Sequence, residues 1–235
     1  MSSRLGTARW WAFAPYATVG SLHLVALAIG ATTVSAATKG LLMPALLLGM
    51  LVALPAVRSG IALWGGLALL FSWAGDLLLS TPGNSGFVAG LGAFLIAHVA
   101  YLVLFLREFR VRRVPRVAFA LVFWWAALLV VLGPYLGTLL LPVAVYGFVL
   151  GGSTAAAFGA TRTIAIGGLL FLASDTLLAF KLFWPDFALW QKDSLVMLGY
   201  ILGQGLIILG TVLIARRRGL IRTAASDATP REFTR

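Results

Sequence analysis

The sequence consists largely of apolar segments that are long enough to cross a lipid bilayer. An α-helix needs about 20 apolar residues to span the hydrocarbon core. Charged residues and Gly/Pro clusters divide the chain into eight such segments, at approximately residues 10–30, 40–57, 61–80, 87–106, 116–133, 136–158, 163–183 and 194–215. The composition, 61% hydrophobic and 11% charged, is also that of an integral membrane protein. We therefore predict an all-α polytopic membrane helix bundle of about eight transmembrane helices, formed by residues 1–218.

The basic residues are distributed unevenly between the loops that join these segments. With eight spans, all fifteen arginines fall on one side of the membrane, and Lys39, Lys181 and Lys192 fall on the other. Loops with an excess of basic residues stay in the cytoplasm, so we predict cytoplasmic termini in a bacterial inner membrane. The division between the fifth and sixth spans rests on residues 133–137. Without a turn there, the basic cluster at 107–116 and the C-terminal arginines would lie on opposite sides.

The net charge of +11 does not indicate a nucleic-acid partner, because the basic residues lie between apolar segments and near the C-terminus. In these positions we expect them to fix the topology and to contact anionic membrane lipid. Residues 219–235 are polar and are predicted to form a disordered cytoplasmic tail. The chain has no cysteine and only two histidines, which excludes a thiol nucleophile and argues against a three-histidine zinc site.

A weak internal repeat divides the predicted spans into two halves of four. An offset of 99 residues aligns Asp76 with Asp175 and Tyr101 with Tyr200. Because each half has an even number of spans, the halves would share one orientation, as parallel repeats do. Leucine-rich helices also align by chance, but the matched aspartates and tyrosines favour two parallel four-helix repeats.

Two aspartates lie inside apolar spans, Asp76 in the third and Asp175 in the seventh. A carboxylate at bilayer depth costs roughly 2.5–3.5 kcal/mol on insertion scales, so such residues usually have a function. Two carboxylates that share a low-dielectric cavity resist joint ionisation, so that one can act as an acid while the other stays anionic. We predict a general acid/base pair. The alternative is that each aspartate only holds the helices together through a basic or amide partner.

Other polar residues occur at helical spacing on the same spans. His98 and Tyr101 share one face of the fourth span, and Tyr200 and Gln204 share one face of the eighth. We expect these faces to line the cavity, although hydrogen bonds between helices would also explain them. His23, alone on the first span, is expected to be a packed histidine.

Two lysines and two serines complete the set of candidates. Lys39 opens the second span and Lys181 closes the seventh, so that either could bind a lipid phosphate or simply reach the membrane surface. Ser72 and Ser174 precede the aspartates closely and could hydrogen-bond to them.

The order of these polar residues resembles that of the YhhN-type lysoplasmalogenases, over about residues 38 to 210. The resemblance is carried by Phe71-Ser72, Gly75-Asp76, Gly90, Phe94, His98, Tyr101, Tyr146, Ser174-Asp175, Lys181, Phe183, Tyr200 and Gln204. It implies an eight-helix membrane bundle. It also implies an enzyme that hydrolyses the vinyl ether bond of lysoplasmalogen, a lysophospholipid, to a fatty aldehyde and a glycerophospho-head group.

Vinyl ether hydrolysis suits a pair of carboxyl groups. Protonation of the vinyl carbon remote from the ether oxygen leaves an oxocarbenium-like cation, which water captures before the hemiacetal collapses. A carboxylic acid can supply the proton while a carboxylate stabilises the cation, as in glycosidases. No metal or organic cofactor is required. On this hypothesis Asp76 and Asp175 are catalytic, in either order of roles, and the substrate is bound by Lys39, Lys181, His98, Tyr101, Tyr146, Tyr200, Gln204, Ser72 and Ser174.

Other membrane functions fit the residues less well. A proton-coupled transporter or lipid flippase is the main alternative, since buried carboxylates and parallel repeats also occur in carriers. An intramembrane aspartyl protease is disfavoured because Trp73 stands where its Gly-x-Gly-Asp signature needs glycine.

Overall fold

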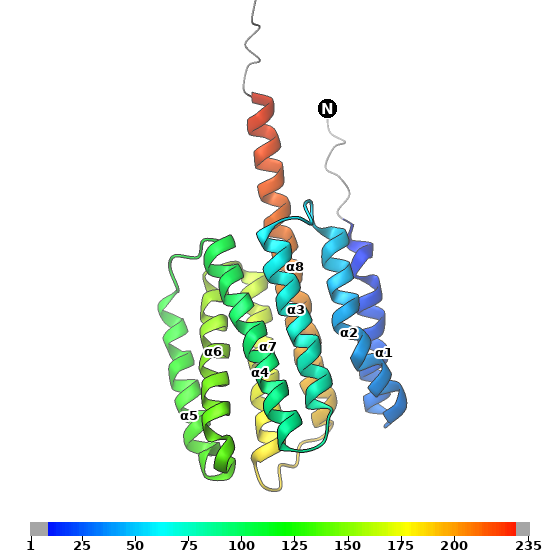
Figure 1. Ribbon diagram of the computed structural model, residues 1–235, viewed down its shortest axis with the longest axis vertical. Helices are drawn as coiled ribbons and strands as arrows, with labels where there is room; N and C mark the ends of the chain where they lie inside the picture. Colours follow the sequence, from blue (N-terminus) through cyan, green and yellow to red (C-terminus); the bar gives the residue numbers. More distant parts are fainter. Residues whose placement is uncertain (1–8, 229–235) are drawn as a thin grey trace, which may run out of the picture.

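The computed structural model describes residues 9–228, and in this range the chain is helical and has no strand (Figure 1). The α-helices are α1 (Ala14–Ala28), α2 (Thr32–Ala53), α3 (Gly60–Leu79), α4 (Asn84–Val103), α5 (Ala120–Leu136), α6 (Leu140–Phe158), α7 (Arg162–Phe183) and α8 (Lys192–Ala228). Short 3-10 helices, η1 (Trp10–Phe13), η3 (Arg116–Phe119) and η4 (Gly137–Leu139), precede α1, α5 and α6, and a π-helical turn, η2 (Leu104–Glu108), ends α4. The predicted all-α class is confirmed.

Seven helical segments of the described chain are long and apolar enough to cross a membrane. One of them, Arg116–Phe158, contains two helices, because the chain reverses at Gly137 with a φ of +50°. The two helices α5 and α6 then pack antiparallel (Figure 1). The predicted turn between the fifth and sixth spans is therefore present, one turn beyond Gly133, and eight helices form the bundle.

The helices form a central group flanked by two hairpins (Figure 1). Helices α3, α4, α7 and α8 occupy the centre, with the α1–α2 hairpin on one side and the α5–α6 hairpin on the other. The α2 helix packs against α3 and α8, and α6 packs correspondingly against α7 and α4. The helices thus pack as two similar halves, which fits the predicted pair of parallel repeats.

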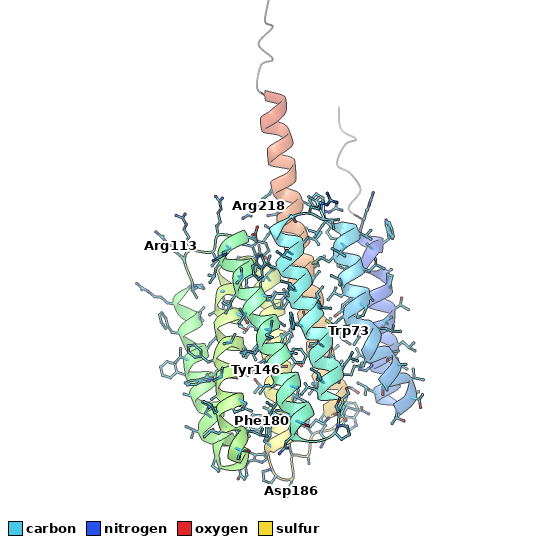
Figure 2. All side chains as sticks on the ribbon, in the orientation of Figure 1. Trp73, Arg113, Tyr146, Phe180, Asp186 and Arg218 are labelled. Carbon is cyan, nitrogen blue, oxygen red and sulfur yellow. The ribbon has the colours of Figure 1, made fainter. Side chains whose placement is uncertain are left out.

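Both ends of the described chain lie at one end of the bundle (Figure 1). Arg113 and Arg218 lie toward this end, whereas Asp186 lies at the opposite end (Figure 2). The apolar surface and the separation of arginines from lysines fit an integral membrane protein. That the arginine end faces the cytoplasm, and that the membrane is a bacterial inner membrane, stay predictions.

Glycines bring α7 and α8 into backbone contact. A Cβ atom added to Gly203 would lie 2.8 Å from the Phe171 nitrogen, and one on Gly167 would lie 2.8 Å from the Gly203 carbonyl oxygen. Small residues allow such close approach between membrane helices. In the other half, a Cβ on Gly75 of α3 would overlap the ring of Phe94 on α4. These contacts fix the register of each pair, and with it the depth of the polar residues that the helices carry.

The starts of corresponding helices in the two halves are not separated by one constant number of residues. Ser59 and Thr161 cap α3 and α7 by accepting hydrogen bonds from backbone nitrogens three residues on. These caps are 102 residues apart, as are Gly65 and Gly167. Helices α2 and α6, and likewise α4 and α8, begin 108 residues apart. The alignment of Asp76 with Asp175 at an offset of 99 therefore stays a prediction.

Two predicted boundaries also differ from the structure. Helix α2 begins at Thr32, so Lys39 lies two turns inside the helix and does not open it. Helix α8 continues to Ala228, where residues 219–228 were predicted to be disordered. The stretch from Leu220 to Ala228 contains neither Gly nor Pro, so extending the helix costs little. The rest of the predicted tail, 229–235, and Arg4 lie outside the described residues.

Candidate active site

A cavity of about 380 Å³ lies in the half of the bundle remote from the arginine-rich end. All eight α-helices contribute to its lining, which is mainly leucine, phenylalanine and other apolar side chains. Its polar lining residues are His23, Ser35, Lys39, Asp76, Tyr146, Ser174, Asp175, Thr176, Lys181, Asp193 and Tyr200. A concave, mostly apolar space with a few convergent polar groups is the usual form of a small-molecule site.

Asp76 lies in the last turn of α3 and is 5% exposed. Its Oδ2 accepts a hydrogen bond of 2.7 Å from the hydroxyl of Tyr200 on α8. Tyr200 is itself buried and packs edge-on against Phe94 and Phe171. This aromatic packing limits the positions that the phenol can take, so that its hydroxyl stays directed at the carboxylate.

Asp175 is partly buried in α7 and accepts a hydrogen bond from the hydroxyl of Tyr146 on α6. Tyr146 lies between the two ends of the bundle (Figure 2). In the other half, Trp73 of α3 donates a hydrogen bond of 2.8 Å to the Gly40 carbonyl of α2. The second and third helices of each half are thus joined by a side-chain hydrogen bond, to a carboxylate in one half and from an indole in the other.

A buried polar network lies behind Asp76 and Tyr200. Gln204, one turn after Tyr200, donates to the hydroxyl of Ser72 at 2.9 Å and accepts from the hydroxyl of Tyr101 at 2.5 Å. These three side chains come from α8, α3 and α4 and are all fully buried. None of them lines the cavity. Their hydrogen bonds hold the three helices in register, and so fix Tyr200 relative to Asp76.

The two lysines of the cavity have different partners. Lys181 forms an ion pair with Asp193 at the start of α8. The ammonium of Lys39 donates to the hydroxyl of Ser80 at 3.0 Å, and that hydroxyl donates to the backbone carbonyl of Asp76. Lys39 has no acidic partner among the described residues. Of the two, Lys39 therefore carries the positive charge that is available to an anionic ligand.

The two histidines are both buried, but only His23 lines the cavity. The Nδ1 of His98 lies 2.9 Å from the Ser153 hydroxyl of α6, and its ring packs against Phe171 and Tyr146. His98 therefore packs against the ring of Tyr146 without lining the cavity itself. The Nδ1 of His23 lies 2.9 Å from the hydroxyl of Thr38 on α2. The expectation that His23 is only packed missed this position, because α2 begins at Thr32, about two turns before the predicted boundary at residue 40.

The structure brings seven of the eleven predicted site residues to one cavity: Asp76, Asp175, Lys39, Lys181, Tyr146, Tyr200 and Ser174. The other four do not line the cavity but lie in the buried networks behind it, where they support the lining residues: His98, Tyr101, Gln204 and Ser72. Ser174 donates to the Val196 carbonyl and not to an aspartate. The catalytic and binding roles of all eleven stay predictions.

Two polar pairs of the cavity wall were not predicted from the sequence: Trp124 with Thr176, and Lys181 with Asp193. Trp124 of α5 donates to the hydroxyl of Thr176 at 3.0 Å, which attaches the α5–α6 hairpin next to Asp175. Asp193 lies at the start of α8, and nothing in the sequence indicated that it would form an ion pair with Lys181. Within residues 9–228 no group of three or more His, Cys, Asp or Glu side chains is arranged to hold a metal ion.

Comparison with known proteins gives one family. A sequence model described as the YhhN family matches residues 34–211, which extend from α2 to α8 and include both aspartates. No curated protein and no solved structure matches the chain. The matched range covers most of the chain, but it begins after α1 and therefore does not include His23.

Proposed function

The chain belongs to the YhhN family, and from this premise we propose that it is a membrane lipid hydrolase that cleaves the vinyl ether bond of lysoplasmalogen. The observation that carries the proposal is the pair Asp76 and Asp175, which line one apolar cavity and each accept a hydrogen bond from a tyrosine. The family match supports the choice of substrate and reaction, and the cavity supports acid/base chemistry.

The reaction consumes one water molecule. A carboxylic acid transfers its proton to the vinyl carbon remote from the ether oxygen, which leaves a cation shared between the other vinyl carbon and the oxygen. A water molecule, from which the carboxylate removes a proton, adds to that carbon. The resulting hemiacetal breaks its bond to the glycerol oxygen, which takes up a proton, and releases the fatty aldehyde. Both carboxyl groups end in their starting states after a proton returns to the acid.

The surroundings of the aspartates suggest their roles. The Lys39 ammonium reaches Ser80, which is bonded to the backbone of Asp76, so a positive charge lies near that carboxylate. The nearest cation on α7, Lys181, is neutralised by Asp193. A nearby cation favours the anionic form of a carboxyl group. We assign Asp76 as the carboxylate that stabilises the cation and activates water, and Asp175 as the acid.

The lining also suits a lipid with one chain. Leucines and phenylalanines of α4 to α7, including Leu91, Leu128 and Phe183, form the apolar wall beyond Asp175. Lys39 belongs to α2, on the flank of the bundle opposite α5 and α6 (Figure 1), where its ammonium could bind the phosphate of the head group. The vinyl ether bond, which lies between chain and head group, would then sit at the carboxyl groups.

The test is release of aldehyde from a 1-alkenyl lysophospholipid by purified protein in detergent. We expect release by the wild type and its loss in Asp76→Asn and in Asp175→Asn. Asp186→Asn is the matched control, because Asp186 lies in an exposed loop outside the cavity. Full activity of either cavity variant in folded protein would defeat the proposed acid/base pair.

A carrier of protons and lipid is the second candidate, favoured by the packing of the helices as two similar halves around the cavity. A carrier would move intact lipid between leaflets of a liposome in response to a proton gradient, without aldehyde release. The wild-type protein in the two assays distinguishes these functions.

A further inference from the structure

The protonation pattern of His23 follows from its hydrogen bonds. Its Nδ1 lies 2.9 Å from the hydroxyl oxygen of Thr38, and that hydroxyl donates at 2.7 Å to the Val34 carbonyl. A threonine hydroxyl has one hydrogen. Since this hydrogen is directed at the carbonyl, the hydroxyl oxygen accepts from Nδ1–H of His23. The neutral ring therefore carries its hydrogen on Nδ1 and a lone pair on Nε2.

The Nε2 atom of His23 is buried and has no hydrogen-bond partner among residues 9–228. Buried polar atoms are nearly always paired, so an exception in a cavity wall indicates a ligand atom. His98 has the same pattern, since Ser153 donates to the Leu150 carbonyl and must accept from its Nδ1–H. His98, however, does not line the cavity. Of the two histidines, only His23 belongs to the cavity wall, and its buried Nε2 becomes accessible to a ligand when neighbouring side chains of the wall move.

The free Nε2 requires a ligand atom that donates a hydrogen bond. The neighbouring wall residues of α2 are Ser35 and Lys39, one turn apart. An ammonium group on the ligand would be repelled by Lys39 and would find a better partner in the Asp76 carboxylate. A neutral hydroxyl has neither disadvantage. The site therefore favours an alcohol group that lies close to the phosphate held by Lys39.

In the substrate of the proposed reaction, on which this inference rests, the free glycerol hydroxyl meets that description. We propose that His23 Nε2 accepts a hydrogen bond from the glycerol 2-hydroxyl of a single-chain phospholipid, and thereby selects lysolipids over lipids whose 2-oxygen is acylated or alkylated. An ester or ether oxygen has no hydrogen to donate and would leave Nε2 unpaired. His23 is thus a specificity-determining residue on a helix that lies outside the range matched by the family.

Binding of a lipid that cannot be hydrolysed tests this inference separately from the reaction. The probes are a saturated 1-alkyl lysophospholipid and its 2-O-methyl derivative, titrated into purified protein in detergent. We expect the wild type to bind the hydroxyl form about 3- to 10-fold more tightly, the range for one hydrogen bond. His23→Asn, which keeps an N–H donor for Thr38 but lacks an atom at Nε2, should bind both lipids with similar affinity.

A second variant covers the case in which His23→Asn does not fold. Thr38→Val removes the acceptor for Nδ1–H and frees the ring to place its hydrogen on Nε2, so it should also reduce the preference for the hydroxyl lipid. Equal binding of both lipids by the wild type, or an unchanged ratio in the variants, would overturn the inference. The inference would also be overturned if the wild type prefers ethanolamine over choline head groups, and the variants lose that preference in place of a preference for the hydroxyl lipid. The group that donates to Nε2 would then be the ammonium.

Failure of this inference and of the proposed function give different results. If the lipid preference depends on His23 but no aldehyde is released from 1-alkenyl lipid, the binding site stands and the reaction fails. If aldehyde is released but the binding ratio is the same in wild type and variants, the reaction stands and the role of His23 is wrong.

Discussion

Tyr200 donates a 2.7 Å hydrogen bond to Asp76 across the interface between α8 and α3, although 124 residues separate them in the chain. Phe94 and Phe171 enclose the phenol ring, and the Gln204 network holds the helix that carries it. A carboxylate held in this way needs no rearrangement when charge develops beside it, which is the condition for electrostatic stabilisation of a cationic intermediate.

Removing either tyrosine hydroxyl should slow the reaction without unfolding the bundle. Tyr200→Phe and Tyr146→Phe keep the ring packing but leave Asp76 and Asp175 without their donors. A hydrogen bond to a charged group contributes about 1.5–3 kcal/mol. Asp76 is anionic throughout the protonation step and Asp175 becomes anionic as it gives up its proton, so we expect kcat to fall roughly 10- to 100-fold in each variant. Rates of aldehyde release check this expectation. Tyr135→Phe, at an exposed position outside the cavity, is the control, and wild-type rates in both cavity variants would be inconsistent with the assigned positioning.

The available charge of Lys39 leads to a prediction about substrate affinity. Replacing Lys39 with Met should raise KM for the phosphate-containing lipid about 10-fold, the equivalent of one charge-assisted hydrogen bond. Lys181→Met should have a smaller effect on KM, because Asp193 already neutralises Lys181. Initial rates over a range of lipid concentrations separate KM from kcat. A larger KM effect for Lys181 would mean that the head group binds at the start of α8.

The contact between α7 and α8 should tolerate no added methyl group. In Gly203→Ala the new Cβ would meet backbone atoms of Phe171 and Gly167, and overpacking of this kind costs about 1–3 kcal/mol. We expect a lower Tm in detergent. Gly92→Ala on α4 is the matched control, since no atom lies within 4 Å of its added Cβ. Equal Tm values for the two variants would show that the helices separate more readily than their packing suggests.

The absence of cysteine from the sequence allows the topology to be tested without background labelling. Arg113 and Asp186 lie at opposite ends of the bundle (Figure 2). In intact bacterial cells, a membrane-impermeant maleimide should label Asp186→Cys, whereas Arg113→Cys should react only after the membrane is permeabilised. The reverse pattern would place the arginine-rich end outside the cell.

Hydropathy predicted the eight helices because the bilayer requires long apolar segments whose backbone hydrogen bonds are internal. It identified Asp76 and Asp175 for the same reason, since a carboxyl group is rare in such a segment. It did not give the register of α7 against α8, because the close contacts at Gly167 and Gly203 depend on backbone positions and not on hydrophobicity. It also placed the start of α2 too late, since residues 32–39 are small and weakly polar, and so His23 and Thr38 could not be paired.

The most direct test of the central claim is aldehyde release carried out in D₂O. Protonation of the vinyl carbon by an acid that exchanges with solvent predicts a fatty aldehyde with one deuterium on the carbon next to the carbonyl. Its formation should be lost in Asp76→Asn and Asp175→Asn and retained in Asp186→Asn. Aldehyde that carries no deuterium, or labelled aldehyde formed at the wild-type rate by both cavity variants, would contradict the proposed chemistry of the aspartate pair.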